Sequence, residues 1–287
     1  MKSKVYFTRI ISPEKVLELY NRLGIELPGK VAVKVHSGEK GNQNFLRPEF
    51  WKQIIDHTGG VVVECNTAYE GMRNTTEKHM QLMKEHGWSD LYEVDILDSK
   101  KPDMMLHIKN GKHLLKNHVG QNLMRYDSLL VLSHFKGHPM GGFGGALKQL
   151  SIGIASGRGK ALIHGVGNAD NFWTSDHNSF LECMAESASS VVDFFKGNAV
   201  YINVMKNMSV DCDCCSVAED PCMNDIGILA SLDPVAVDKA CLDLVYKSDD
   251  PGKYRMIERI ESKNGVLTIE AAEKLGIGTT QYELIEL

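Results

Sequence analysis

Apolar residues gather in short runs along the first two-thirds of the chain, separated by more polar stretches. Each run is rich in β-branched residues and is bounded by turn-forming residues, which is the pattern of a buried strand. Strands are predicted on this basis at residues 31–35, 61–65, 128–132, 161–164 and 199–204. Their short length and continuous apolar character favour strands of a sheet that is covered by other elements.

Apolar residues recur at helical spacing between several of these runs. The pattern predicts a helix over residues 14–23 and a clearer one over residues 180–195, with a more polar candidate at residues 75–86. Strands that alternate with helices build βαβ units. The chain is therefore predicted to be an α/β protein with a mostly parallel or mixed sheet and flanking helices.

The C-terminal third is predicted to be mainly helical. Asp233 and Asp250 are each followed by proline, which is the usual start of a helix, and the helices are expected to run to Tyr246 and Glu261. The remaining elements are a short helix from Thr268 to Gly276 and a final strand or tail at residues 282–287. We divide the chain into an α/β portion, residues 1–200, and a portion with a cysteine cluster and helices, residues 201–287, which could also form one continuous domain.

Composition is that of an ordinary globular protein, with 43% hydrophobic and 24% charged residues among 287. The formal net charge of -5 argues against a nucleic-acid partner, because a phosphate-binding surface usually carries a positive excess. A small molecule or a protein, such as an electron-transfer partner, fits this charge better. The sequence does not indicate an oligomeric state.

No targeting or membrane segment is recognisable in the sequence. The N-terminus carries two lysines without an apolar stretch behind them, and no run approaches the roughly 18 apolar residues of a spanning helix. We therefore expect a cytoplasmic protein without membrane contact. In a reducing compartment the seven cysteines are expected to bind metal or carry out redox chemistry rather than form disulfides.

Ionisable side chains follow the predicted strands. They are Lys34, His36 and Glu39 after the first strand and His134, Lys136 and His138 after the third. The carboxyl ends of parallel strands share one edge of a sheet, where such folds bind ligands, so we expect these groups to gather in a cleft. They would bind or protonate a small anionic substrate there, unless they are simply solvated strand ends. The spacing of His134 and His138 is also compatible with a pair of metal ligands.

A glycine-rich segment follows the third strand. Gly142, Gly144 and Gly145 precede Lys148, with Arg158 further along, but neither a Walker A motif nor a clean dinucleotide fingerprint is present. A loop of this kind that leads into a helix can direct backbone N–H groups at an anion, and the two basic residues would add charge. The alternative is a tight structural turn against the sheet.

The strongest chemical signal is a cluster of four cysteines. Cys212, Cys214, Cys215 and Cys222 lie within eleven residues, directly after the last predicted apolar strand. Several thiolates that converge satisfy Zn²⁺ or the iron of an iron–sulfur cluster. The spacing is that of neither a zinc ribbon nor a bacterial ferredoxin. Buried or redox-reactive thiols without metal are the alternative interpretation.

Several of these segments together resemble a known family. Lys34-x-His36-x-x-Glu39, the histidine and glycine-rich residues 133–148, the cysteines of residues 211–214 and residues 225–238 are similar to the family catalogued as domain of unknown function 362. The resemblance implies an uncharacterised iron–sulfur centre protein, although the ferredoxin-like insert of some members is missing from this sequence. It also implies a metal site at Cys212 and Cys214 that forms one composite site with the histidine and lysine segments.

We therefore expect a metal or iron–sulfur binding protein, either a redox enzyme or a metal-assisted enzyme that acts on a small anionic substrate. The cofactor would be an iron–sulfur cluster or Zn²⁺. Two other classes remain open: a non-catalytic protein with a closed structural zinc site, and a thiol-redox sensor that uses Cys214 or Cys215.

Overall fold

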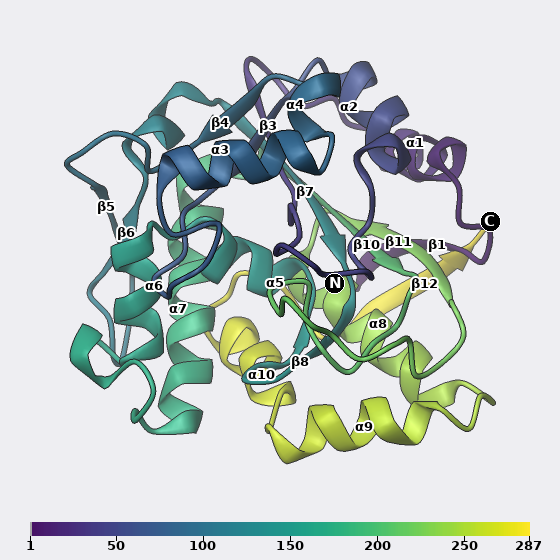
Figure 1. The fold of residues 1–287 in the computed structure, drawn as a ribbon. Coiled ribbons are helices and arrows are strands. Elements are labelled where there is room, and N and C mark those ends of the chain that lie inside the picture. Colours follow the sequence, from purple (N-terminus) through teal and green to yellow (C-terminus); the bar gives the residue numbers. More distant parts are fainter. Residues whose placement is uncertain (1) are drawn as a thin grey trace.

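One large β-sheet lies between two layers of helices in the computed structural model, which describes residues 2–287 (Figure 1). The eight strands have the order β12-β1-β11-β10-β7-β2-β3-β4. The strands from β10 to β4 are mutually parallel, and β11 runs antiparallel to both of its neighbours. The strands are β1 (Ser3–Thr8), β2 (Val31–Lys34), β3 (Val61–Glu64), β4 (Val94–Ile96), β7 (Ser128–His134), β10 (Ala199–Met205), β11 (Gly227–Ser231) and β12 (Tyr282–Glu286). The predicted α/β class with a mostly parallel or mixed sheet is confirmed.

Helices cover both faces of this sheet, which explains why its central strands are apolar without alternation. On one face α1 (Pro13–Arg22) and α2 (Lys52–Thr58) enclose a core that includes Leu19, Ile54 and Val33. On the other face α5 (Ala146–Lys148), α7 (His177–Phe195) and α8 (Pro234–Lys247) enclose a larger core. The other helices are α3 (Thr76–Glu85), α4 (Trp88–Leu91), α6 (Gly157–His164), α9 (Lys253–Ser262) and α10 (Val266–Lys274).

Short elements complete the fold. Strands β5 (Met104–His107) and β6 (Lys116–Val119) form one hairpin, and β8 (Lys136–His138) and β9 (Gly142–Gly144) form another. The tight helical turns are η1 (Pro48–Trp51), η2 (Gln121–Arg125), the π-helix η3 (Gln149–Gly153) and η4 (Ala169–Asn171). Within residues 2–287, no helix combines the length and the apolar composition needed to cross a membrane.

Three predicted elements are wrong in detail, one of them the helix predicted to start at Asp250, since the N-cap of α9 is Gly252. The strand predicted at residues 161–164 is the end of α6, because Ser156 caps a helix by accepting a hydrogen bond from the Gly159 N–H at 3.0 Å. Thr268 lies inside α10, whose N-cap is Gly265. The division of the chain near residue 200 falls inside β10, and strands from both sides of that position share the sheet.

The chain leaves β2 in one direction along the sheet and β7 in the other. From β2 it proceeds to β3 and β4 at one edge, whereas from β7 it proceeds to β10 and β11 on the opposite side. Open α/β sheets bind ligands outside the carboxyl ends of strands at such a switch point. The segments that carry most of the predicted site residues follow β2 and β7.

Candidate functional site

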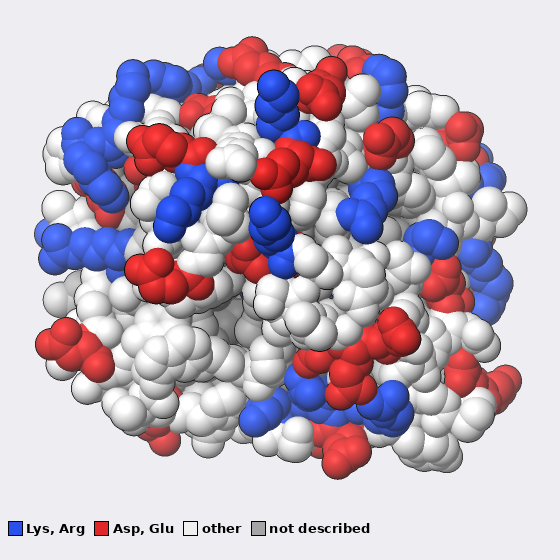
Figure 2. Space-filling model, viewed as in Figure 1, with Lys and Arg blue, Asp and Glu red and all other residues white. Residues whose placement is uncertain are grey.

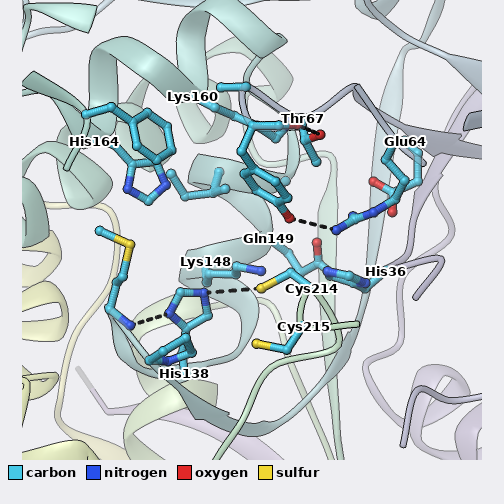
Figure 3. Close-up of a pocket in the computed structure, with 18 of the residues that line it drawn as sticks. His36, Glu64, Thr67, His138, Lys148, Gln149, Lys160, His164, Cys214 and Cys215 are labelled. Atoms are coloured by element: carbon cyan, nitrogen blue, oxygen red, sulfur yellow. Dashed lines mark hydrogen bonds between the residues drawn. The ribbon is translucent and has the colours of Figure 1, made fainter. Parts of the chain in front are cut away.

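A cavity of about 300 Å³ opens near the carboxyl ends of β2 and β3 (Figure 3). Figure 2 shows the face of the molecule that is hollowed beside α5 and α6, with mainly uncharged surface along its lower and left margins. The volume is at the lower end of the range for small-molecule sites. Polar lining residues are Lys34, His36, Glu64, Thr67, Tyr69, Arg73, His138, Lys148, Gln149, Lys160, His164, Cys214 and Cys215.

The cysteines lie on a loop, residues 206–226, that buried ion pairs fasten to β7 and β8. Asp213 accepts from His134 Nδ1 at 2.9 Å and pairs with Lys136 Nζ at 2.9 Å, with all three side chains at most 3% exposed. His134 Nε2 faces the Lys206 carbonyl, so both ring nitrogens have hydrogen-bond partners that fix the ring in place. Burial alone would raise the pKa of the Asp213 carboxyl group, but the nearby His134 and Lys136 have the larger combined effect and lower this pKa.

This arrangement gives His134, Lys136 and Glu39 supporting positions. None of the three lines the cavity. Glu39 pairs with the cavity residue Arg73 at 3.0 Å, and its backbone N–H donates to the Asp213 carbonyl at 2.8 Å. The loop after β2 and the hairpin after β7 therefore both hold the cysteine loop in place.

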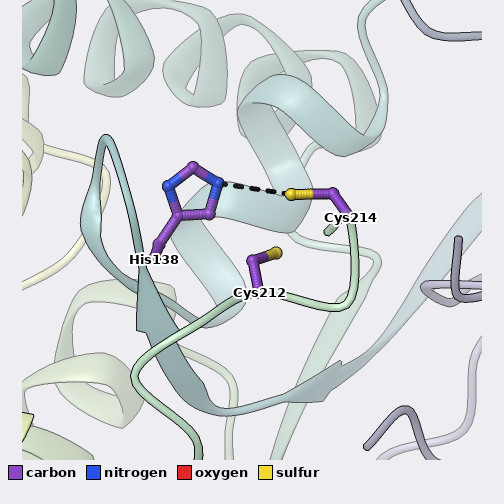
Figure 4. Close-up of side chains that lie close together, drawn as sticks. All are labelled: His138, Cys212 and Cys214. Atoms are coloured by element: carbon purple, nitrogen blue, oxygen red, sulfur yellow. Dashed lines mark hydrogen bonds between the residues drawn. The ribbon is translucent and has the colours of Figure 1, made fainter. Parts of the chain in front are cut away.

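Three possible metal ligands meet at the wall of the cavity (Figure 4). One ligand atom from each of His138, Cys212 and Cys214 lies within 4.8 Å of the other two. Cys212 is fully buried, whereas His138 and Cys214 line the cavity. Two thiolates and an imidazole make a donor set that suits Zn²⁺, and an open side toward a cavity is typical of a catalytic rather than a structural zinc site.

Basic groups around Cys212 favour its thiolate, whereas hydrogen bonds with Cys212 and Cys215 raise the pKa of Cys214. Burial alone would raise the pKa of the Cys212 thiol, but a hydrogen bond with Cys214 and the nearby Lys148 and Lys136 ammoniums hold it well below its usual value. Lys148 Nζ lies 3.5 Å from Cys212 Sγ. An ionised sulfur at neutral pH is the form that binds a soft metal.

The proton on His138 bears on how this group would bind metal. Nδ1 accepts from the N–H groups of Met140 and Gly141 at 3.1 and 2.8 Å, so the proton of the neutral ring lies on Nε2, which faces the Cys214 sulfur at 3.9 Å. A neutral ring that binds metal through Nε2 must carry its proton on Nδ1. Nδ1 could then no longer accept the hydrogen bonds from Met140 and Gly141.

The other two predicted metal ligands do not belong to this group. Cys215 lines the cavity beside Cys214, and its own pKa is lowered through the hydrogen bond with Cys214. Cys222 is turned away, with its thiol directed at the Met208 carbonyl at 3.2 Å. A cluster held by all four cysteines, as in Cys₄ iron–sulfur sites, is not assembled in this arrangement.

The floor of the cavity holds more positive than negative charge. Lys34 pairs with Glu64 at 2.7 Å, and burial lowers the pKa of Lys34 although Glu64 opposes this effect. Lys148 and Lys160 have no such partner: within residues 2–287, no carboxylate oxygen lies within 4.0 Å of either ammonium. Lys160 instead donates to the Ala155 carbonyl at 2.7 Å.

Two buried polar atoms of the lining also have no hydrogen-bond partner within residues 2–287. They are Gln149 Oε1 and His164 Nδ1, on residues that are 3% and 7% exposed. Buried polar atoms are nearly always satisfied in native proteins, so water or a bound molecule in this cavity would supply the partners of both atoms. Burial lowers the pKa of His164 to about 3, which keeps this ring neutral at physiological pH.

The glycine-rich segment has a different role from the predicted anion-binding loop. Gly142 and Gly144 belong to β9, which pairs with β8. The backbone N–H groups of Ala146 and Leu147, which begin α5, already donate to the buried carboxylate of Asp238 at 2.7 and 2.9 Å. A Cβ at Gly145 would lie 2.3 Å from that carboxylate, so this close approach requires glycine.

The two basic residues predicted beside this segment separate in space. Lys148 reaches the cavity, whereas Arg158 is exposed on α6 and does not line it. Sequence reasoning missed Lys160 and Gln149 as site residues. Lys160 and His164 are four residues apart on α6 and both line the cavity, a spacing that becomes visible only once this segment is recognised as a helix.

A family model described as Domain of unknown function (DUF362) matches residues 31–243. The chain belongs to the DUF362 family. This match includes the histidine, lysine and cysteine segments of the site, and it confirms the resemblance seen in the sequence. No curated protein matches the chain.

Solved structures similar to this DUF362 chain are distant in sequence. The lactate racemase apoprotein from Thermoanaerobacterium thermosaccharolyticum has 18% identity and a TM-score of 0.42 over 69% of this chain and 50% of that one. A protein from Thermotoga maritima has 12% identity and a TM-score of 0.48 over 82% of this chain and 59% of that one. This chain therefore spans about half to three-fifths of the length of these two proteins.

Proposed function

We propose that this DUF362 protein is a metal-dependent enzyme that acts on a small anionic substrate. His138, Cys212 and Cys214 would hold a soft divalent metal, with Zn²⁺ as the best fit to two thiolates and one imidazole. The observation that carries the proposal is the position of this group at the wall of a cavity whose floor contains two ammoniums without carboxylate partners.

The two lysines account for the anionic substrate. An ammonium that is buried without a counter-charge costs several kcal/mol, so the site gains most from an occupant with negative charge at Lys160, since the Cys212 sulfur already lies beside Lys148. Lys148 is 7% exposed and partners the Cys212 sulfur, while Lys160 is 7% exposed and partners only carbonyls. Lys160 therefore binds the substrate anion, and Lys148 balances the charge of the Cys212 sulfur.

A bound Zn²⁺ with an open position would polarise a substrate carbonyl or lower the pKa of a water molecule. The chain itself supplies the other functions. Arg73 is held by Glu39 and donates to the Tyr69 hydroxyl at 3.0 Å, which fixes two polar groups on the wall near Cys214. His164, which is neutral and has an unpartnered Nδ1, is placed to form a hydrogen bond with the substrate.

Metal content of two cysteine variants tests the proposal. Cys214→Ser removes a proposed ligand, and Cys222→Ser is its matched control because that thiol lies on the same loop but outside the group. Protein purified without oxygen is expected to contain about one zinc per chain, which C214S loses and C222S retains. Equal loss in both variants, together with iron and acid-labile sulfide, would instead establish a four-cysteine iron–sulfur site.

A result without any metal would favour thiol chemistry. The hydrogen bonds that link Cys212, Cys214 and Cys215 already place three thiols together. In that case thiol titration is expected to change with oxidant, and C214S should abolish the change while C222S should not.

A further inference from the structure

The cavity changes in character from its floor to its mouth. Lys160 and His164 lie one turn apart on α6 and both face the cavity, as Figure 3 shows. The His164 ring packs at a tilt against Phe172 with ring centroids 4.4 Å apart, and Phe172 contacts Trp173 with centroids 4.5 Å apart. One wall therefore leads from a cation through a neutral imidazole to two aromatic rings.

A second part of the lining also combines polar and apolar side chains. Lys148 ends α5, and Gln149 and Ile152 follow on the π-helix η3. Met140, from the β8–β9 turn, also lines the cavity, and Met140 and Ile152 each pack against the core under α6 and α7. π-Helical turns occur often at functional sites, and a methionine adapts its flexible thioether to a flat aromatic partner.

Trp173 is the most unusual residue of the mouth. It lines the cavity and yet is 72% exposed, while Trp51 and Trp88 are at most 2% exposed. Single exposed apolar residues are common, but this indole adjoins an aromatic pair at the entrance to a site with two unpartnered buried polar atoms. Such a rim is suited to cover a flat apolar group, since aromatic pairs gain energy beyond the area that they bury.

From these walls we infer that the substrate is an aromatic carboxylate. The carboxylate lies at Lys160, and the ring lies against Phe172, Trp173 and Met140 at the mouth. This inference rests on the proposed function for the anionic end of the substrate and adds the chemistry of its other end.

Binding of three carboxylates that differ in their ring tests this inference, with affinities measured by calorimetry on the full chain as purified. They are 3-phenylpropanoate, 3-cyclohexylpropanoate, which has a ring of similar size without π electrons, and propanoate, which has no ring. We expect 3-phenylpropanoate to bind at least about 10-fold more tightly than propanoate. It should also bind at least about 3-fold more tightly than 3-cyclohexylpropanoate.

Two variants at one exposed position locate the ring. Trp173→Ala is expected to weaken 3-phenylpropanoate by about 3- to 10-fold and to leave propanoate unchanged, whereas Trp173→Phe should keep most of the affinity because it retains an aromatic ring. In the unmodified protein, the fluorescence of Trp173 should change on binding of 3-phenylpropanoate, and the signals of buried Trp51 and Trp88 should not.

The outcomes separate this inference from the function on which it rests. Equal binding of all three acids, or no effect of W173A, would overturn the aromatic assignment alone and leave an anion site. Tighter binding of the cyclohexyl acid would overturn it in favour of an aliphatic tail. Failure of all three acids to bind would overturn both the anionic substrate and its aromatic end.

Discussion

Replacement of Lys160 by methionine is expected to stabilise the protein, whereas the same replacement of Lys34 is expected to destabilise it. Both ammoniums are buried and line the same cavity, at 7% and 1% exposure. They differ in their partners, because Lys34 pairs with the Glu64 carboxylate at 2.7 Å and Lys160 has only carbonyl partners. Methionine has a similar length and no charge, so each change removes mainly the ammonium.

The expected magnitudes follow from these partners. Loss of Lys34 leaves the Glu64 carboxylate buried without its cation, which typically costs about 3–5 kcal/mol. Hydrogen bonds from the Ser37 N–H and hydroxyl, at 2.9 and 3.1 Å, place this case at the lower end of the range. Loss of Lys160 relieves a desolvation penalty of several kcal/mol and forfeits a charged hydrogen bond worth about 1.5–3 kcal/mol, which leaves a net gain of about 1–2 kcal/mol.

Urea unfolding at pH 7 measures both effects through the midpoint at constant m-value. The free energies of unfolding of K160M and K34M should differ by about 4–5 kcal/mol, with the unmodified protein between them. K160M should also lose carboxylate binding, because stability at this position is gained at the expense of the substrate site. If K160M is destabilised as strongly as K34M, the reasoning that treats Lys160 as an unpaired cation is refuted.

Three other predictions concern residues that hold the site in place. Asp213→Asn leaves His134 and Lys136 without their shared carboxylate and should lower the free energy of unfolding by about 3 kcal/mol in urea, with loss of bound metal; unchanged stability would show that these ion pairs do not anchor the loop. Asp238→Asn turns an amide donor toward the Ala146 and Leu147 N–H groups and should cost about 2–3 kcal/mol in the same assay, with Asp243→Asn as the control on the same helix. Burial lowers the pKa of His79 to about 3 in the folded protein. As the pH falls below the ordinary histidine pKa, this side chain gains a proton in the unfolded chain but stays neutral in the native state, so the free energy of unfolding should decrease. His79→Gln is expected to reduce the stability lost between pH 7 and pH 5 by about 2 kcal/mol, and an unchanged pH dependence would contradict a neutral buried imidazole.

Much of the fold was predictable because its strands are chemically uniform. Runs such as Val61-Val62-Val63 are buried on both faces, and this leaves a signal that does not depend on distant parts of the chain. Strands β1 and β11 were missed, and the former pairs with β11 and β12 from the other end of the chain. Pairing across such distances is not encoded in local periodicity.

The sequence indicated several segments of the candidate site but not how they assemble. Residues after β2 and β7 converge as expected, because parallel strands present their carboxyl ends at one edge. The sequence could not show that His138 meets Cys212 and Cys214, or that His134 is engaged by Asp213, since the cysteine loop returns across the sheet from 70 or more residues away. Lys160 was obscured by an apolar run too short to distinguish a strand from a helix.

X-ray absorption at the zinc edge of protein purified without oxygen tests the central claim most directly. The account predicts two sulfur ligands at about 2.3 Å and at least one nitrogen or oxygen ligand at about 2.0–2.1 Å, with a histidine signature that disappears in His138→Ala. Four sulfur ligands, or iron with sulfide in place of zinc, would contradict a site built from His138, Cys212 and Cys214.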